Sequence, residues 1–184
     1  MTEIEIPYRF ESEKLWWVIP NVLTSLECDN MIKRIQESNP ELATNNSLFR
    51  DQDRVICDDP DWASELFSRL RPHLTVKMGA FELARLNERL RMYRYRTGQR
   101  FLPHTDHWYR PNENEITLHT VLVYLNDNFK GGETRFIEDI EATVIPKQGS
   151  VLIFQHKLRH EGCPVLQGTK FAIRTDVVYR LGAK

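Results

Sequence analysis

The stretch that decides how this chain is interpreted is Tyr95-Arg-Thr-Gly-Gln-Arg-Phe-Leu-Pro-His-Thr-Asp106, taken together with His160-Glu-Gly162 far downstream. It places His104 and Asp106 two positions apart, and it leaves His160 as a third candidate ligand. Two histidines and a carboxylate in this pattern are typical of the facial triad that holds non-haem Fe(II) and leaves coordination positions open. Side chains two apart on a strand point the same way, so we expect His104 and Asp106 to bind one ion together.

Other histidines compete for the role of ligand. His107 follows the first ligand by three positions and would point away from it on a strand. His156 precedes the distant ligand by four, which is a ligand spacing only in a helix, and the apolar run Val151–Phe154 favours a strand. We therefore expect both residues to support the site or the fold. His73 and His119 belong to no cluster and are expected to be structural.

Length and composition indicate one soluble globular domain, 1–184. The chain has 184 residues, of which 41% are hydrophobic and 28% are charged, enough for a sizeable core. The formal net charge of -1 gives no sign of a nucleic-acid or anionic-membrane partner. We interpret the arginines that precede the motif as a solvated strand face rather than a nucleic-acid groove. They are Arg89, Arg91, Arg94, Arg96 and Arg100.

Cysteine usage and the first residues of the chain predict a cytoplasmic protein. There are 3 cysteines without a CxxC motif, which suits a reducing compartment. The first residues, Met1-Thr-Glu-Ile-Glu-Ile-Pro7, are acidic and lack the apolar core of a secretory signal. No stretch approaches the ~18 apolar residues of a membrane span, so we expect no membrane partner. No heptad pattern indicates an oligomeric state.

Two helices are predicted in the first half of the chain. Thr24-x-x-Glu27 forms a capping box, and behind it apolar residues recur with the period of one helix face. Asp59-Pro60-Asp61 begins the second helix, because proline suits the first helical position and either aspartate can cap it. That helix is expected to end near Pro72. The apolar face of the first helix consists of Cys28, which we expect to be a buried, inert thiol, Met31, Ile32 and Ile35.

The segments around these helices carry weaker signals. Leu15–Ile19 is continuously apolar and predicts a strand that ends at Pro20. Residues 38–58 are polar and broken, which predicts a loop, and residues 75–87 fit a helix and a strand equally well. We therefore expect residues 1–88 to be mostly helical and to support the second half of the chain.

From residue 89 onward short β-rich runs alternate with turn signals. Glycines and prolines separate these runs at Gly131-Gly132, Pro146-x-x-Gly149 and Gly168. Helices followed by many short strands predict a mainly β fold, a sandwich or barrel with helices on one face, with its core in 89–184. The predicted strands are Ile116–Leu125, Thr134–Phe136, Ala142–Ile145, Ser150–Gln155 and Lys170–Tyr179.

Several motifs succeed one another in a fixed order through this half. They are Tyr95-x-x-Gly98-Gln99-x-Phe101-x-x-His104-x-Asp106, Tyr124-Leu-Asn-Asp127, Gly131-Gly132-Glu133-Thr134-x-Phe136, Pro146-x-x-Gly149, Phe154-x-His156-x-x-x-His160-Glu161-Gly162-x-Pro164-Val165 and Gly168-x-Lys170-x-x-x-Arg174-x-Asp176-x-x-Tyr179. As an ordered set they resemble the 2-oxoglutarate- and Fe(II)-dependent dioxygenase superfamily, in its prolyl 4-hydroxylase-like branch. The resemblance implies a double-stranded β-helix, the jelly-roll barrel of that superfamily, supported by two or three helices.

The resemblance also implies the roles of individual residues. Lys170 would bind the distal carboxylate of 2-oxoglutarate, which is sound because a buried carboxylate needs a charged partner. Tyr95 and Tyr124 match positions that line the cosubstrate pocket, and a place in the sheet core is the equal alternative. The implied iron ligands are His104, Asp106 and His160.

Arg174 leaves a choice open. It lies four residues after Lys170 on the same predicted strand face, which is about 13 Å, so both cations are not expected to touch one carboxylate. Either Lys170 anchors 2-oxoglutarate and Arg174 pairs with Asp176 or the substrate, or the roles are reversed, since arginine grips a carboxylate bidentately. We favour Lys170.

The reaction implied by the resemblance uses Fe(II), 2-oxoglutarate and O2, with ascorbate as a further cofactor, to hydroxylate a C–H bond and release succinate and CO2. We expect a peptidyl residue such as proline as substrate; a free amino acid or small metabolite is the alternative. A non-catalytic metal-binding or sensor domain is a rival that the complete triad and Lys170 argue against. A zinc or nickel cupin-like enzyme is another rival, and it would not need Lys170.

Overall fold

The computed structural model describes residues 9–43, 50–138 and 141–182. Within these ranges the helices are α1 (Ser25–Glu37), α2 (Pro60–Leu70) and the short 3-10 turn η1 (Arg71–His73). The strands are β1 (Trp16–Ile19), β2 (Glu41–Leu42), β3 (Asp53–Asp58), β4 (Lys77–Met78), β5 (Phe81–Leu86), β6 (Arg89–Arg96), β7 (Phe101–His104), β8 (Glu115–Tyr124), β9 (Lys130–Gly131), β10 (Thr134–Phe136), β11 (Ala142–Val144), β12 (Val151–Gln155), β13 (His160–Gly162), β14 (Val165–Gln167) and β15 (Thr169–Leu181).

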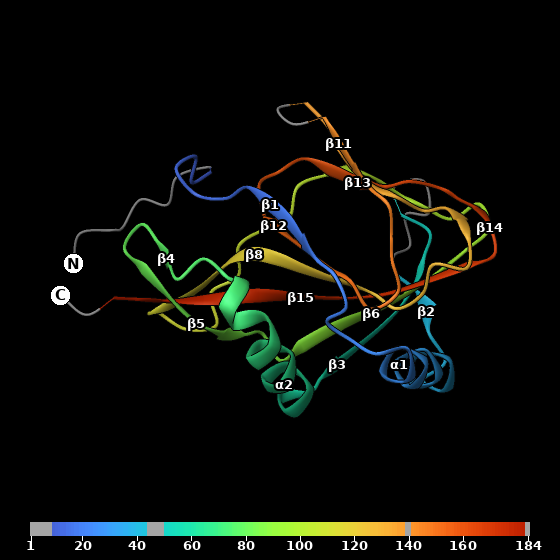
Figure 1. The fold of residues 1–184 in the computed structure, drawn as a ribbon, viewed down its shortest axis with the longest axis horizontal. Helices are drawn as coiled ribbons and strands as arrows, with labels where there is room; N and C mark the ends of the chain where they lie inside the picture. Colours follow the sequence, from blue (N-terminus) through green and yellow to red (C-terminus); the bar gives the residue numbers. More distant parts are fainter. Residues whose placement is uncertain (1–8, 44–49, 139–140, 183–184) are drawn as a thin grey trace.

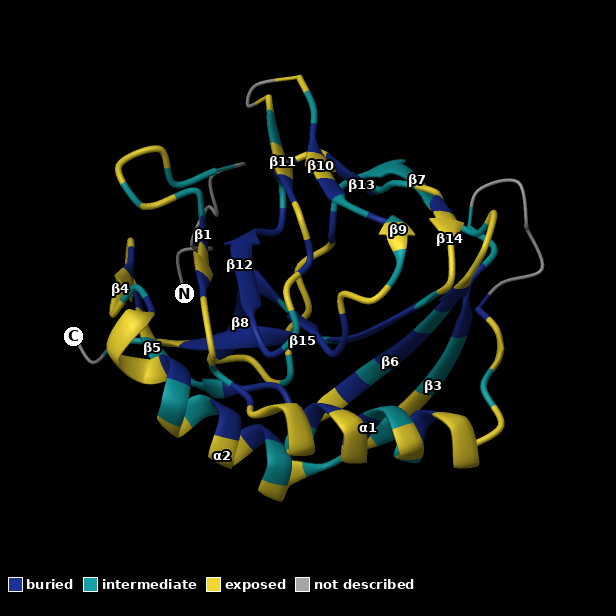
Figure 2. Cartoon of the chain, turned by 45° about the vertical axis from the view of Figure 1, so that its right-hand side comes forward, coloured by how far each residue is buried: buried dark blue, intermediate teal, exposed yellow. Residues whose placement is uncertain are grey.

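The elements form three layers (Figures 1 and 2). The main sheet has the strand order β1-β12-β8-β15-β6-β3-β2, with β5 and β4 attached at one end. Helices α1 and α2 cover one of its faces, and the smaller sheet, β11-β10-β13-β7, lies across the other. The predicted mainly β, jelly-roll-like fold with helical support is confirmed. No described helix is both long and apolar enough to cross a membrane.

Strand β15 organises the main sheet. It pairs with β8 on one side and with β6 on the other, and its C-terminal part also pairs with β5. Phe171, Ile173 and Val177 lie in the core cluster that the helices share. Lys170 and Arg174 alternate with them and line a cavity below the smaller sheet. One strand therefore builds the core with one face and lines the cavity with the other.

Helix α1 forms where the capping box predicts it. The Thr24 side chain accepts a hydrogen bond from the Glu27 backbone N–H, and the Glu27 carboxylate accepts one from the Thr24 backbone N–H. Cys28, Met31 and Ile35 are the buried residues of this helix. Burial raises the pKa of the Cys28 thiol to about 11, which agrees with an inert structural cysteine.

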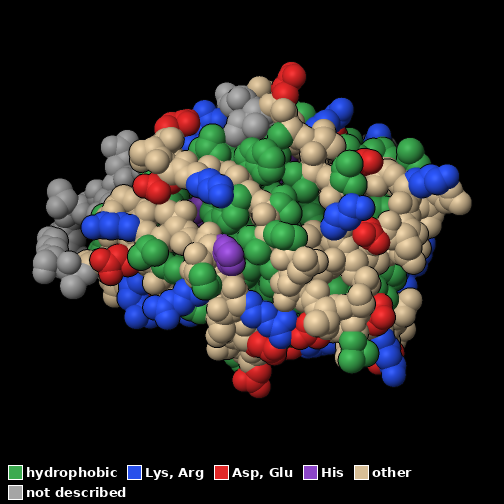
Figure 3. All heavy atoms as spheres, viewed as in Figure 1, with side chains coloured by type: hydrophobic (Ala, Val, Ile, Leu, Met, Phe, Trp, Pro, Cys, Tyr) green, Lys and Arg blue, Asp and Glu red, His purple; other side chains and the backbone are tan. Residues whose placement is uncertain are grey.

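Helix α2 is capped by Asp59, whose side chain accepts from the Trp62 backbone N–H. The Arg69 guanidinium contacts both Glu65 of its own helix and Glu27 of α1, with an Nη2–Oε1 distance of 2.6 Å to Glu27. These ion pairs tie the two helices together, and Figure 3 shows acidic and basic side chains gathered over α1 and α2.

Two predictions for the first half are wrong. Residues 38–58 are not a loop, because their described part contains β2 and β3. Residues 1–88 are not mostly helical either, since their described part also supplies β1 to β5, and β3 and β5 pair with β6 and β15. Val55 and Cys57 of β3 pack against the core, although this strand is polar at both ends and exposes Ile56. Pairing with a distant strand outweighs such local composition.

The Glu27 cap generates a stability prediction. Hydrogen bonds from Arg69, followed by the bond to Thr24, lower the pKa of Glu27 from 4.5 to about 2. A pKa that is lower in the folded state stabilises the protein above the unfolded-state pKa, and this stabilisation is lost as the pH falls through the folded-state value. We expect Glu27→Gln to lower the free energy of unfolding near neutral pH by about 1 kcal/mol.

Urea denaturation of wild type and Glu27→Gln across the acid range measures this effect. The difference between them should shrink as the pH falls from 4.5 towards about 2. Asp29→Asn, which neutralises an exposed carboxylate on the same helix, is the matched control and should stay close to wild type. A Glu27→Gln difference that does not change with pH would contradict the assigned role of the charge.

Candidate functional site

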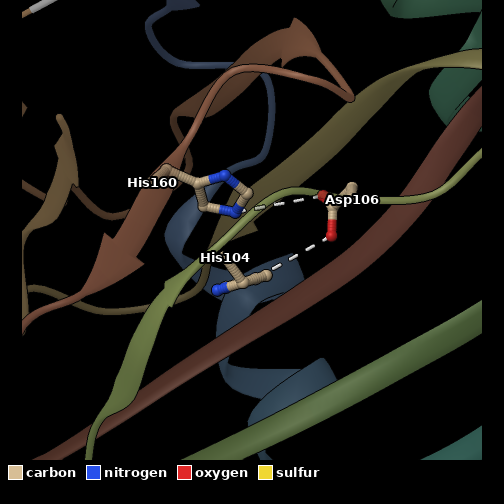
Figure 4. Close-up of side chains that lie close together, drawn as sticks. All are labelled: His104, Asp106 and His160. Carbon is tan, nitrogen blue, oxygen red and sulfur yellow. Dashed lines mark ion pairs between the residues drawn. The ribbon is translucent and has the colours of Figure 1, made fainter. Parts of the chain in front are cut away.

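Three side chains converge between the two sheets (Figure 4). His104 ends β7, and His160 begins β13 directly opposite it. Asp106 lies two residues after His104, beyond the end of β7, so the expectation that one strand carries both is wrong. The ligand atoms of the three residues nevertheless all lie within 4.8 Å of one another. His104 Nε2 and His160 Nε2 are each 3.9 Å from an Asp106 oxygen.

Both histidines are held in the form that binds a metal. The Nδ1–H of His104 donates to the Leu102 carbonyl at 2.7 Å, and that of His160 donates to the Leu158 carbonyl at 2.9 Å. Nε2 of each ring therefore carries no proton and faces Asp106. Burial, followed by repulsion from His160, lowers the pKa of His104 to about 4, and burial also lowers the pKa of His160. Neutral imidazoles near neutral pH are ready ligands.

The Asp106 carboxylate is buried and charged. The Thr120 hydroxyl donates to its Oδ2, and Arg174 Nη1 lies 3.0 Å from its Oδ1. Its backbone N–H donates to the His156 carbonyl at 2.8 Å. Burial alone raises the pKa of Asp106, but attraction to Arg174 and then to the nearby imidazoles outweighs it and holds this pKa well below its ordinary value. The site therefore offers a fixed negative charge to a cation.

Behind Asp106 runs a chain of hydrogen bonds that the sequence did not reveal. Because the Thr120 hydroxyl gives its proton to Asp106, the Nδ1–H of His156 must donate to Thr120, at 2.9 Å. His156 Nε2 then accepts from the Thr117 hydroxyl at 3.0 Å. His156 is thus a supporting residue, as expected. The available signal was two threonines in a mostly apolar strand, since a buried hydroxyl needs a partner.

The remaining histidines take no part in the cavity. His107 is exposed beyond the end of β7, and His73 is exposed in η1. His119 is buried in the main sheet, where its Nδ1 hydrogen-bonds to the Tyr179 hydroxyl at 3.0 Å. None of the three belongs to the only group of potential metal ligands in the described part of the chain, which agrees with the expectation that they are not ligands.

Lys170 lies at the other end of the same cavity and is 3% exposed. Its Nζ donates to the Gly132 carbonyl at 2.7 Å and stands 5.3 Å and 5.4 Å from the ring centres of Tyr95 and Tyr124. Burial lowers its pKa to about 8. No carboxylate of the described residues forms an ion pair with it. A buried ammonium with one carbonyl and two ring faces has donors left for an anionic ligand.

Gly132 fits this place because of its missing side chain. Its φ is +69°, and a Cβ there would lie 2.9 Å from the Phe129 ring and 3.2 Å from Lys170 Cδ. Any larger residue would push against the lysine stem and strain the backbone. The close approach of Gly132 to Lys170 thus depends on glycine.

Tyr95 and Tyr124 are both buried, with 7% and 0% exposure. Tyr95 lines the cavity, whereas the Tyr124 hydroxyl bonds to Thr134 at 2.7 Å. Tyr95 shares this space with the triad and with Lys170. Both tyrosines therefore stand beside Lys170, and Tyr124 is also part of a buried core cluster.

Arg174 pairs with acids at the metal-ligand end. Its Nη2 lies 3.0 Å from Asp176, one of the two expected arrangements, and its Nη1 contacts Asp106, which the sequence did not indicate. Asp176 is in turn 3.2 Å from Arg91. Ion pairs thus run from Asp106 through Arg174 and Asp176 to Arg91, whereas Lys170 pairs with no carboxylate of the described residues.

Loss of the Thr120 hydroxyl should weaken metal binding. Thr120→Val keeps the shape of the side chain and removes the donor to Asp106, so Asp106 loses orientation. Removal of such supporting groups typically costs 10- to 100-fold in metal affinity, and we expect a loss of about that size for Mn(II) or Fe(II). Anaerobic calorimetric titration measures it. Thr143→Val, on the exposed side of β11, is the matched control, and equal affinities for all three proteins would contradict the role of Thr120.

Comparisons with known proteins agree with this geometry. Residues 90–175 match the family described as the 2OG-Fe(II) oxygenase superfamily. The chain is 26% identical to Probable prolyl 4-hydroxylase 6 of Arabidopsis thaliana, over 82% of this chain and 64% of the relative. It is also 26% identical to Prolyl 4-hydroxylase 2 of the same plant, over 85% of this chain and 64% of the relative. The chain thus spans 64% of the length of these relatives.

Solved structures share the fold. The viral collagen prolyl hydroxylase of Paramecium Bursaria Chlorella virus-1, in its 2OG complex, superposes with a TM-score of 0.68 at 21% identity, covering 92% of this chain and 98% of that one. A Trichoplax adhaerens prolyl hydroxylase in complex with a hypoxia inducible factor peptide fragment has a TM-score of 0.66 at 19% identity, covering 88% and 82%.

Proposed function

Because residues 90–175 match the 2OG-Fe(II) oxygenase superfamily, we propose that this chain hydroxylates a C–H bond of a peptidyl residue, with proline the first candidate, and releases succinate and CO2. The observation that carries the proposal is the pairing, in one cavity, of a complete His-Asp-His group with a buried lysine that lacks a carboxylate partner among the described residues.

The donor set fits the metal. Two neutral imidazoles and one charged carboxylate on one side of a cavity are the ligands of a non-haem Fe(II) site. When bound there, Fe(II) and 2-oxoglutarate supply the O2-dependent oxidation of a C–H bond. His104, Asp106 and His160 would hold the metal, while Thr120 and Arg174 keep the Asp106 carboxylate charged and oriented.

Lys170 would bind the far carboxylate of 2-oxoglutarate. Its ammonium is buried at the opposite end of the cavity from Arg174, and ion pairing would offset the cost of its burial. Tyr95 and Tyr124 flank the ammonium and keep water away from it. Arg174 is less suited to this role, because its Nη1 and Nη2 already serve Asp106 and Asp176.

A peptide is favoured as substrate over a free amino acid. The curated relatives are named prolyl 4-hydroxylases, and the Trichoplax adhaerens structure contains a peptide fragment. The segment after Asp106 also presents Trp108 and Tyr109 with 37% and 53% exposure. Exposed aromatic rings beside the metal ligand suit a partner that extends beyond the cavity. A non-catalytic sensor domain would require no buried Lys170.

Succinate formation from 2-oxoglutarate tests the reaction. Wild type reconstituted anaerobically with Fe(II) and then exposed to O2 should form succinate slowly without substrate and faster with an accepted proline-containing peptide. His104→Ala should abolish it by loss of a ligand. Lys170→Met should raise the KM for 2-oxoglutarate by about 10-fold or more, through loss of a charge-assisted bond, while metal affinity stays near wild type.

Arg71→Gln, on the exposed η1 turn, is the control that should behave as wild type. No succinate from wild type, together with no thermal stabilisation by Mn(II) and 2-oxoglutarate, would refute the oxygenase proposal. It would instead favour a metal-binding domain.

A further inference from the structure

Two arginines, each next to a residue that lines the metal cavity, pair with no acid of the described residues. The first, Arg50, forms a β-bridge with Phe101, and its guanidinium carbon lies 4.8 Å from the centre of the Phe101 ring. The same Phe101 ring stacks on His104, with 3.6 Å between ring centres. A single aromatic ring therefore separates the Arg50 charge from a metal ligand.

The second, Arg54, lies on strand β3 of the main sheet. It stands directly opposite Tyr93 in the β3–β6 pairing, and Tyr93 lines the cavity. Arg91, two residues before Tyr93, faces Ile56 of β3 in the same register. Burial, followed by repulsion from Arg50 and then a smaller effect of Arg91, lowers the pKa of Arg54, so these charges are close enough to affect one another.

The hydrogen bonds of Arg50 are incomplete, and those of Arg54 reach no charged group of the described residues. Nε and Nη2 of Arg50 are buried without a hydrogen-bond partner in the described part of the chain. Arg54 Nη2 donates to the Ala43 carbonyl at 3.1 Å, and this is a neutral acceptor. Buried guanidinium donors without acceptors are costly and call for an explanation. Oxygens of a bound ligand would supply what is missing.

The charges around the cavity do not balance either. Within 4.0 Å, no carboxylate of residues 9–43, 50–138 or 141–182 pairs with Arg50 or Arg54. Asp51, their acidic neighbour in the chain, accepts from the Arg100 backbone N–H, and its single negative charge offsets only one of the two guanidinium groups. Residues 44–49, Thr-Asn-Asn-Ser-Leu-Phe, contain no acid. Bound Fe(II) and 2-oxoglutarate carry opposite charges of equal size, so loading the site leaves the excess positive charge in place.

We infer that the substrate carries a carboxylate close to the C–H bond that is hydroxylated, and that Arg50 and Arg54 bind this carboxylate at the cavity mouth. The inference rests on the proposed function and adds a chemical class of substrate to it. A carboxylate matches the planar fork of a guanidinium, and two such groups can share its oxygens. Its source is an acidic side chain beside the target residue of a peptide, or the carboxylate of a free amino acid.

Binding can be measured without turnover, with Mn(II) and 2-oxoglutarate in the site. The probes are two labelled short peptides with a central proline, one flanked by glutamates and the other by glutamines, followed by fluorescence anisotropy. The glutamate peptide should bind wild type about 10- to 100-fold more tightly, the effect of charge-assisted hydrogen bonds. This preference should shrink as salt is added.

Arg54→Gln should remove most of the preference for the glutamate peptide and leave the affinity for the glutamine peptide unchanged. Arg54→Lys keeps the charge but lacks the planar guanidinium, so it should retain only part of the preference for the glutamate peptide. Arg50→Gln should act in the same direction, but Arg54 is the cleaner site because Arg50 also packs on Phe101. Arg71→Gln controls for a general loss of positive charge, and melting temperatures check that each variant is folded.

Unlabelled L-proline and L-glutamate distinguish the two sources. If a free amino acid displaces the glutamate peptide from wild type but not from Arg54→Gln, the recognised carboxylate belongs to a free amino acid. If neither free amino acid displaces it, the carboxylate belongs to a peptide side chain. Equal affinities for both peptides with no binding of either free acid would overturn the inference, as would an Arg54→Gln effect of equal size on both peptides. Succinate formation by wild type, measured separately, tells this failure apart from failure of the oxygenase proposal.

Discussion

The ion pair between Asp106 and Arg174 is the interaction on which the site depends. A carboxylate that is only 4% exposed would gain a proton if burial acted alone, and a protonated acid is a poor ligand for a divalent cation. Arg174 prevents this from 3.0 Å away. Removing one partner of a buried pair typically costs about 3–5 kcal/mol, because the other charge stays buried. The stability of the fold and the affinity for the metal therefore both depend on this ion pair.

Arg174 in turn needs its own compensation. Asp176 supplies it, and Arg91 partly neutralises Asp176. Because Asp176 and Arg174 alternate on β15 with core residues, the strand that closes the hydrophobic core also sets the charges of the cavity. Lys170, on the same strand face, stays outside this series of ion pairs. The two cations in one cavity therefore have different roles. Arg174 pairs with the metal ligand Asp106, whereas Lys170 can bind an anion.

Much of this site could be predicted from the sequence, because its signals are local or ordered. The spacing of His104 and Asp106, the distant His160 and the Thr24 capping box need no knowledge of the packing. The pairing of β3 with β6 was not predictable in the same way, since the polar residues before Asp53 say nothing about a partner some forty residues away. The Arg174–Asp106 contact was missed for a related reason: it joins two segments through space, and strand spacing alone pointed to Asp176.

Thr120 shows the same limit at smaller scale. Its hydroxyl orients a metal ligand, yet in the sequence it is one threonine in a strand rich in β-branched residues. Its role becomes visible through the partner on each side, Asp106 and His156. Residues that orient a metal ligand through a hydrogen bond are recognised only when the partners of every buried polar group are known.

A crystal structure of the chain with Mn(II) and 2-oxoglutarate would test the central claim most directly. We predict the metal on His104, Asp106 and His160, with Arg174 still paired to Asp106 and the far carboxylate of 2-oxoglutarate within hydrogen-bond distance of Lys170 Nζ. A far carboxylate bound by Arg174, with Asp106 released from it, would contradict the claim, and so would a metal held by other residues.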